Sequence, residues 1–232
     1  MQARVINILL CFCVFLLLWA GAEAVAALML YARGEPFRFP ESDEHLFALE
    51  KNSSYGYVLK KEVRHLAVKQ SKDGVECYRA RYQTDHFGRR KVGPDRSAES
   101  LLLLFGCSVT FGEGIDDDQT LQWHLGRKLP ERMVYNYAVH GYGPSHALAK
   151  IRSGEVSKET TRSRADGLYV LIPDHVSRVI GDTRAYWIYS SPYFYHTPNN
   201  ALAGGRSFWE RRPLTTALYA SLSWVKRHSP LL

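Results

Sequence analysis

From residue 100 onward, short apolar segments alternate with segments of helical composition. Residue types and lengths predict strands at 101–105, 133–139 and 167–172, and helices at 120–129 and 145–159. Strands separated by a helix pair in parallel through right-handed crossovers. The continuous apolar run 101–105, "LLLLF", is typical of a strand buried on both faces of such a sheet. This part of the chain is therefore predicted to form an α/β fold, with Thr120 and Ser145 as candidate helix N-caps.

The preceding residues have a different pattern. Residues 32–50 contain two prolines and many charges, which indicates a linker. Residues 55–95 alternate in polarity, are rich in β-forming residues and contain the turn signals "KDG" and "HFG". We expect a small antiparallel β-hairpin unit here. The predicted organisation is a membrane segment at 1–31, a linker and β unit at 32–95, and an α/β domain at 96–232 that includes a helix at 211–228.

The first thirty residues are strongly apolar. Between Val5 and Tyr31 only Asn7 and Glu23 are strongly polar, which is enough helix to cross about 30 Å of hydrocarbon. Two interpretations compete: an uncleaved signal anchor, and a signal peptide cleaved at Ala22-Glu23-Ala24. The apolar run resumes after Glu23, which favours the anchor. We expect a single-pass protein of the cell inner membrane with its globular domain on the extracytoplasmic, periplasmic side.

Charge and cysteine content exclude several classes of function. The formal net charge is +7, but there is no zinc finger, aromatic RNA-binding signature or dense basic stripe, so no nucleic-acid partner is expected. No metal-ligand spacing appears among the four cysteines, and no cofactor is expected. Cys77 and Cys107 could pair in an oxidising compartment, which spacing alone cannot establish.

Polar and glycine residues follow each of the three predicted strands. They stand at 106–108, at 140–143 and at 173–175. Because the carboxyl ends of parallel strands meet at one edge of a sheet, these groups should share a site. A hydroxyl, flexible glycine backbones, a carboxylate and an imidazole suit acyl transfer. Taken singly, each residue is also a plain turn or cap residue. The candidate site residues are Ser108, Gly141, Gly143, Asp174 and His175.

Three stretches resemble blocks of the SGNH (GDSL-type) hydrolases, in their membrane-anchored bacterial branch. They are "LLLLFGCSVTFGEGIDDDQT", "VYNYAVHGYGPSHAL" and the pre-domain segments "YGYVLKK" and "YQTDHFGRR". The resemblance implies a three-layer, flavodoxin-like parallel sheet. It also implies Ser108 as nucleophile, Gly141 as the oxyanion glycine with Gly143 close behind, and Asn136 as a structural residue.

The chain departs from the family pattern at two blocks. Where the third block should read Gly-x-Asn-Asp, the sequence reads "IPDH", so Asp174 stands in place of the oxyanion Asn and His175 is a substitute donor. The family's Asp-x-x-His base block and its fourth and fifth strands are not found. We therefore weigh three outcomes: a C-terminally truncated protein with an incomplete sheet, a substitute base at His140, His146 or His175, and a non-catalytic relative.

The function expected from the resemblance is that of an esterase or acyltransferase. It would act on ester-linked substrates, such as polysaccharide O-acyl groups, through an acyl-serine intermediate. The alternative is an inactive relative that serves as a membrane-anchored glycan-binding or scaffolding protein.

Overall fold

The structure is a computed structural model that describes residues 9–19, 21–22, 25, 49–71, 73–93, 98–160, 164–180 and 191–211. Residues 9–19 are helical. Among the described residues, no helix combines the length and apolar character needed to cross a bilayer. The expected membrane segment 1–31 and the expected helix at 211–228 both lie largely outside the described residues.

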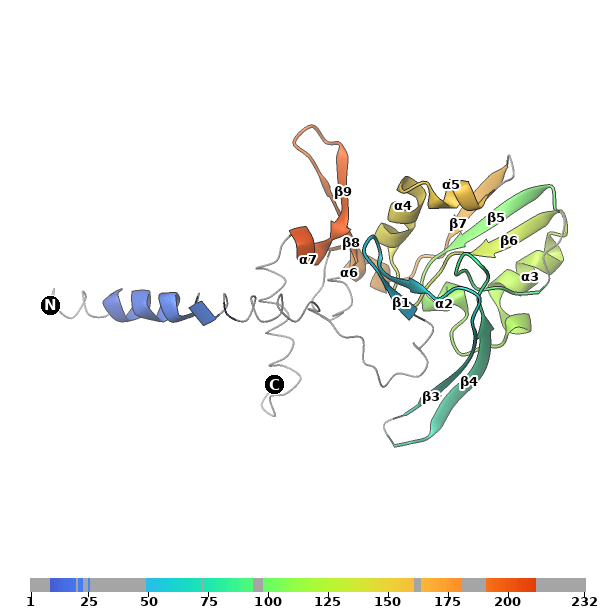
Figure 1. The fold of residues 1–232 in the computed structure, drawn as a ribbon, viewed down its shortest axis with the longest axis horizontal. Coiled ribbons are helices and arrows are strands. Elements are labelled where there is room, and N and C mark those ends of the chain that lie inside the picture. The colour runs from blue at the N-terminus through green and yellow to red at the C-terminus, as the bar shows by residue number, and fades with distance from the viewer. Residues whose placement is uncertain are drawn as a thin grey trace.

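A three-stranded parallel sheet forms the centre of the domain (Figure 1). Strand β5 (Ser100–Phe105) lies between β6 (Arg132–Asn136) and β7 (Ala165–Tyr169), and it pairs in parallel with both. All six residues of β5 are buried, as expected for a central strand. The predicted α/β fold with a parallel sheet is confirmed.

Helices cover both faces of the sheet at β5 and β6, whereas four of the five residues of the edge strand β7 are exposed. On one face, α3 (Leu121–Lys128) packs its Leu125 against Leu102 and Leu104 of β5. On the other face, α4 (Pro144–Arg152) and α5 (Glu155–Glu159) contribute Ala147 and Val156 to a cluster with the alternate residues of β5. The alternation of side chains along a strand explains how one apolar run supplies two cores.

Several predicted boundaries were wrong. The strands expected at 133–139 and 167–172 are observed at Arg132–Asn136 and Ala165–Tyr169. The expected helix 145–159 is divided into α4 and α5 at Gly154, whose φ of 76° lies outside the helical region. Its N-cap is Gly143 rather than Ser145, because Pro144 occupies the first helical turn. Thr120 caps α3 as predicted, with its side chain accepting a hydrogen bond from the Trp123 amide.

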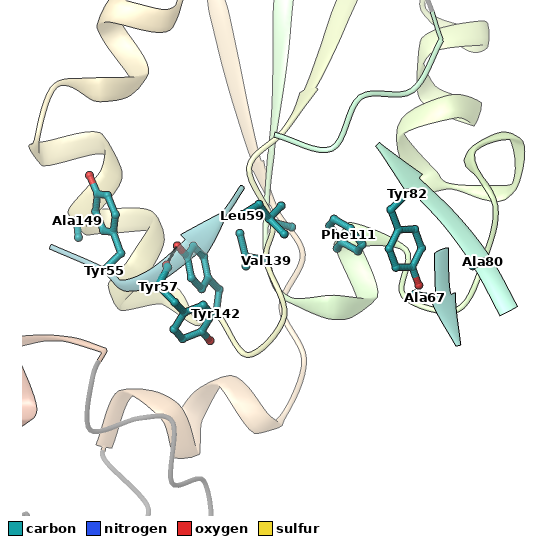
Figure 2. Packing of buried hydrophobic residues seen from close by; sticks show 11 residues of the cluster. Tyr55, Tyr57, Leu59, Ala67, Ala80, Tyr82, Phe111, Val139, Tyr142 and Ala149 are labelled. Atoms are coloured by element: carbon teal, nitrogen blue, oxygen red, sulfur yellow. Dashed lines mark hydrogen bonds between the residues drawn. The ribbon is translucent and has the colours of Figure 1, made fainter. Parts of the chain in front are cut away.

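The region before the sheet forms two antiparallel hairpins, as expected. Strand β1 (Leu49–Asn52) pairs with β2 (Gly56–Leu59), and β3 (Arg64–Gln70) pairs with β4 (Glu76–Gln83). Both hairpins pack against the α/β part through one buried cluster (Figure 2). In this cluster Tyr57 lies beside Tyr142, with ring centroids 5.3 Å apart, and Tyr82 meets Phe111 edge-on at 5.0 Å.

Beyond the sheet, α6 (Asp174–Ile180) follows β7, and β8 (Pro192–His196) pairs antiparallel with β9 (Leu202–Ser207) before the short helix α7 (Phe208–Arg211). The two strands pair with each other and do not extend the parallel sheet. Arg152 of α4 donates to the Leu202 carbonyl and so ties this hairpin to the domain.

Candidate functional site

The turn after the central strand places Ser108 at the start of a short helix. Helix α2 spans Ser108–Phe111, and Cys107 before it is fully buried. Gly106 has no room for a side chain, since a Cβ there would lie 2.0 Å from Thr110 Oγ1. The turn therefore forms only with glycine at that position, and it leaves Ser108 partly exposed. Cys77 and Cys107 are free thiols, so the disulfide considered between them is not formed.

Arg90 holds the far end of α2. Its side chain is fully buried, and its guanidinium donates to the carbonyls of Phe111 and Gly112 at 2.8 and 2.6 Å. The same group donates to the Ile115 carbonyl and to the carboxylate of Asp117. Gly112 ends the helix at φ 86°, in the left-handed region that favours glycine. One arginine thus fixes the whole bend between α2 and the next turn.

The second strand end is connected to α2 by a buried amide. Asn136, the last residue of β6, donates from its side chain to the Thr110 carbonyl and accepts from the Ala138 amide. The second bond turns the chain out of the strand, which explains why β6 ends at residue 136 and not at 139. The loop 137–143 therefore starts directly beside α2.

His140 in this loop is hydrogen-bonded to Glu113. The imidazole Nδ1 lies 2.9 Å from Glu113 Oε2, and the ring packs 4.6 Å from that of Phe111. Burial alone would raise the pKa of Glu113, but His140, the Tyr78 hydroxyl and Lys69 together lower it to about 2. Glu113 is anchored by its amide, which donates to the Ser108 carbonyl at 2.9 Å. The pair is therefore built onto the turn that carries Ser108.

The third strand end places His175 inside the protein. Its Nδ1 accepts from the Ile172 amide at 3.3 Å and lies 3.0 Å from the Tyr169 hydroxyl. Its Nε2 is buried without a hydrogen-bond partner among the described residues. Burial, together with the charge of Arg178, lowers the pKa of His175. Asp174, by contrast, is on the surface, with its side chain 77% exposed.

Arg178 joins the second and third strand ends. This residue of α6 donates to the Tyr142 carbonyl at 2.6 Å. A Cβ added to Gly143 would lie 3.2 Å from the Cβ of Arg178. The Gly143 amide itself donates to Nδ1 of His146, so it is already engaged. Gly141, at φ 73°, carries no such bond to a described residue and is the better oxyanion candidate of the two.

The hydrogen bonds assign a tautomer to three histidines near the strand ends. A neutral imidazole carries one proton, so the nitrogen that accepts a backbone N–H leaves the proton on the other. Nδ1 accepts in His146 and in His175, so each holds its proton on Nε2. In His140, Nδ1 faces a carboxylate and donates to it, which leaves Nε2 free to accept a proton. His140 has the arrangement of a general base, and His175 that of a donor.

Glu113 and Arg90 were not among the residues proposed from the sequence. Glu113 lies in "TFGEG" and Arg90 in "HFGRR". The partner of Glu113, His140, is 27 residues away, and the partners of Arg90 are 21 to 27 residues away. Neither motif spacing nor periodicity indicates such pairings.

Hollows are present among described residues in other parts of the molecule. Neither of the two with volumes near 400 Å³ is lined by Ser108. Among the described residues, no group of three or more His, Cys, Asp or Glu side chains could hold a metal ion.

No protein-family model matches the chain, and no curated protein matches it by sequence.

Proposed function

We propose that the protein is a serine esterase or acyltransferase of SGNH type, with Ser108 as its nucleophile. The observation that carries this proposal is the position of Ser108. It is a partly exposed hydroxyl on the first residue of α2, directly after the central strand of a parallel sheet. Such strand ends are where α/β proteins place their ligands. The motif resemblance of the sequence supports the same reading.

Roles for the other groups follow from the tautomers. His140 accepts the Ser108 proton at Nε2 while Glu113 orients its ring. The Ser108 oxygen then bonds to the ester carbon, and the amides of Ser108 and Gly141 stabilise the oxyanion. His175, expected from the sequence as a substitute donor, has its Nε2 buried and is given no contact with the substrate. The alcohol leaves with the proton held by His140. Water or an acceptor hydroxyl attacks the acyl-serine in the second half of the reaction. Asp174 has no role in these steps.

The natural substrate in this proposal is an ester-linked acyl group, such as an O-acyl group on a polysaccharide. The N-terminal apolar segment anchors the chain in the inner membrane, with the domain on the extracytoplasmic side. The apolar composition of residues 5–31 supports this placement. The competing function is glycan binding or scaffolding without turnover.

Turnover of p-nitrophenyl acetate by the full chain tests the proposal. Ser108→Ala should reduce the rate to background, and His140→Gln should lower kcat at least about 100-fold by removing the base. Ser145→Ala, which changes a serine that caps no helix, is the matched control and should retain the wild-type rate. Equal background rates for all four proteins would reject catalysis and favour the non-catalytic function.

A further inference from the structure

A hollow of about 410 Å³ lies among the β1–β2 hairpin, the turn at residues 87–89 and helices α4 and α5. Small-molecule sites typically have volumes of about 300–1,000 Å³. The loop after β6 forms part of the wall through Tyr137, Val139 and Tyr142. Ser108 and His140 do not line the hollow, so it is separate from the groups proposed for catalysis.

One oxygen of a buried carboxylate in this wall lacks a hydrogen-bond partner among the described residues, while the carboxylate as a whole interacts with the Tyr137 hydroxyl. The side chain of Glu159, at the end of α5, is only 10% exposed. Its Oε2 accepts no hydrogen bond from any described residue. Arg89 Nη1 lies 3.8 Å away, which neutralises the charge but is too far for a hydrogen bond. Buried polar atoms are normally satisfied, so this oxygen is placed to accept from a bound molecule.

The charges around the hollow nearly balance. The basic side chains are Lys61, Arg89, Lys150 and Lys158, and the acidic ones are Glu50, Glu155 and Glu159. Some already pair with each other, since Lys150 Nζ lies 3.3 Å from Glu155 Oε2. A strongly anionic or cationic ligand would meet like charges on one side of the wall. The lining favours an uncharged ligand that both donates and accepts hydrogen bonds.

Aromatic rings complete the wall. Phe87, Tyr137 and Tyr142 line the hollow together with the apolar side chains of Val58 and Leu59. Planar rings offer apolar contact area with few rotatable bonds. A ligand with C–H faces as well as hydroxyl groups matches both parts of this lining, and a pyranose ring has both.

We propose that the hollow binds an uncharged segment of a carbohydrate chain, with a sugar hydroxyl donating to Glu159. The inference deepens the proposed function by giving the acyl-bearing polymer a second point of attachment. It rests on the proposed function only in assigning a biological role to the bound sugar. Binding itself requires neither Ser108 nor turnover, so the two ideas fail separately.

Saturation-transfer NMR of the full chain with three tetrasaccharides tests the inference. The probes are cellotetraose, which is uncharged, tetragalacturonate, which is anionic, and the chitosan tetramer, which is cationic. Wild type and Ser108→Ala should both bind cellotetraose and prefer it to the charged probes. Preference for either charged probe, or no binding of cellotetraose by the wild type, would overturn the proposal.

Two variants locate the binding. Glu159→Ala should raise the Kd for cellotetraose about tenfold, since a sugar hydroxyl loses its charged acceptor. Val58→Trp should abolish binding by filling the hollow. Val68→Trp, at a similarly half-buried position of strand β3 outside the hollow, is the matched control and should bind normally. Normal binding by a folded Val58→Trp protein, verified by circular dichroism, would place the sugar elsewhere and refute the site.

Discussion

Gly112 carries two separate constraints at the end of α2. Its φ of 86° strains any other residue, and an added Cβ would lie 2.9 Å from both Arg90 Nη1 and Thr120 Cγ2. Gly154, between α4 and α5, shares the first constraint at φ 76° but has nothing within 4 Å of an added Cβ. The two glycines therefore separate backbone strain from crowding.

Alanine substitutions at these two glycines should differ in cost. Gly154→Ala is expected to lower the free energy of unfolding by about 1 kcal/mol, the cost of left-handed backbone alone. Gly112→Ala should lower it by about 3 kcal/mol, because Arg90 must also move from its buried site. Urea denaturation of both variants measures the difference. Equal losses would show that Arg90 does not pack against this turn.

His146 is buried in neutral form beside Tyr142. Burial, assisted by the charge of Arg178, lowers its pKa to about 3. The unfolded chain, with an ordinary histidine pKa near 6.5, binds more protons below that pH than the folded protein does. Stability contributed by the neutral ring is therefore complete above about pH 6.5 and is lost as the pH falls toward 3.

Replacing His146 should flatten the pH dependence of stability. Between pH 7 and pH 5 the wild type should lose about 2 kcal/mol of unfolding free energy through this residue. His146→Gln can still accept from the Gly143 amide but cannot be protonated, so it should not show that loss. Urea denaturation at the two pH values measures both slopes. The same slope in both proteins would mean that the imidazole is hydrated in the folded state.

At the scale of elements, the cap of α3 carries a stability prediction. Thr120 is fully buried, and its hydroxyl accepts from the Trp123 amide and donates to the Asp117 carbonyl. Thr120→Ala should cost about 1–2 kcal/mol, and Thr120→Ser should retain most of the stability. Thermal unfolding of both variants tests this. A loss in Thr120→Ser as large as that in Thr120→Ala would assign the effect to the methyl group instead of the cap.

The elements were predictable where local chemistry determines them. The apolar run of β5 and the cap at Thr120 are local signals, and both predict what is observed. The end of β6 was missed, because the Asn136 side chain turns the chain by accepting from the Ala138 amide, while the bond that holds this side chain in place runs to Thr110, 26 residues away. The break at Gly154 was missed because an isolated glycine is tolerated inside many helices.

At the scale of the whole molecule, the parallel pairing of the three strands could be predicted, but the contacts across the site could not. The sequence brings Ser108, the loop 140–143 and residues 173–175 to the same sheet edge, as parallel topology requires. It does not indicate that Glu113 pairs with His140, or that Asp174 is on the surface while His175 is buried. These depend on packing between segments distant in sequence.

Labelling of the full chain with a fluorophosphonate, followed by peptide mass spectrometry, tests the central claim most directly. An activated serine bonds to the phosphorus and displaces fluoride, whereas an ordinary surface serine does not react. We predict a single adduct on the peptide that contains Ser108, and its loss in His140→Gln. No adduct, or an adduct on another serine, would contradict the claim that the turn after β5 presents a nucleophile.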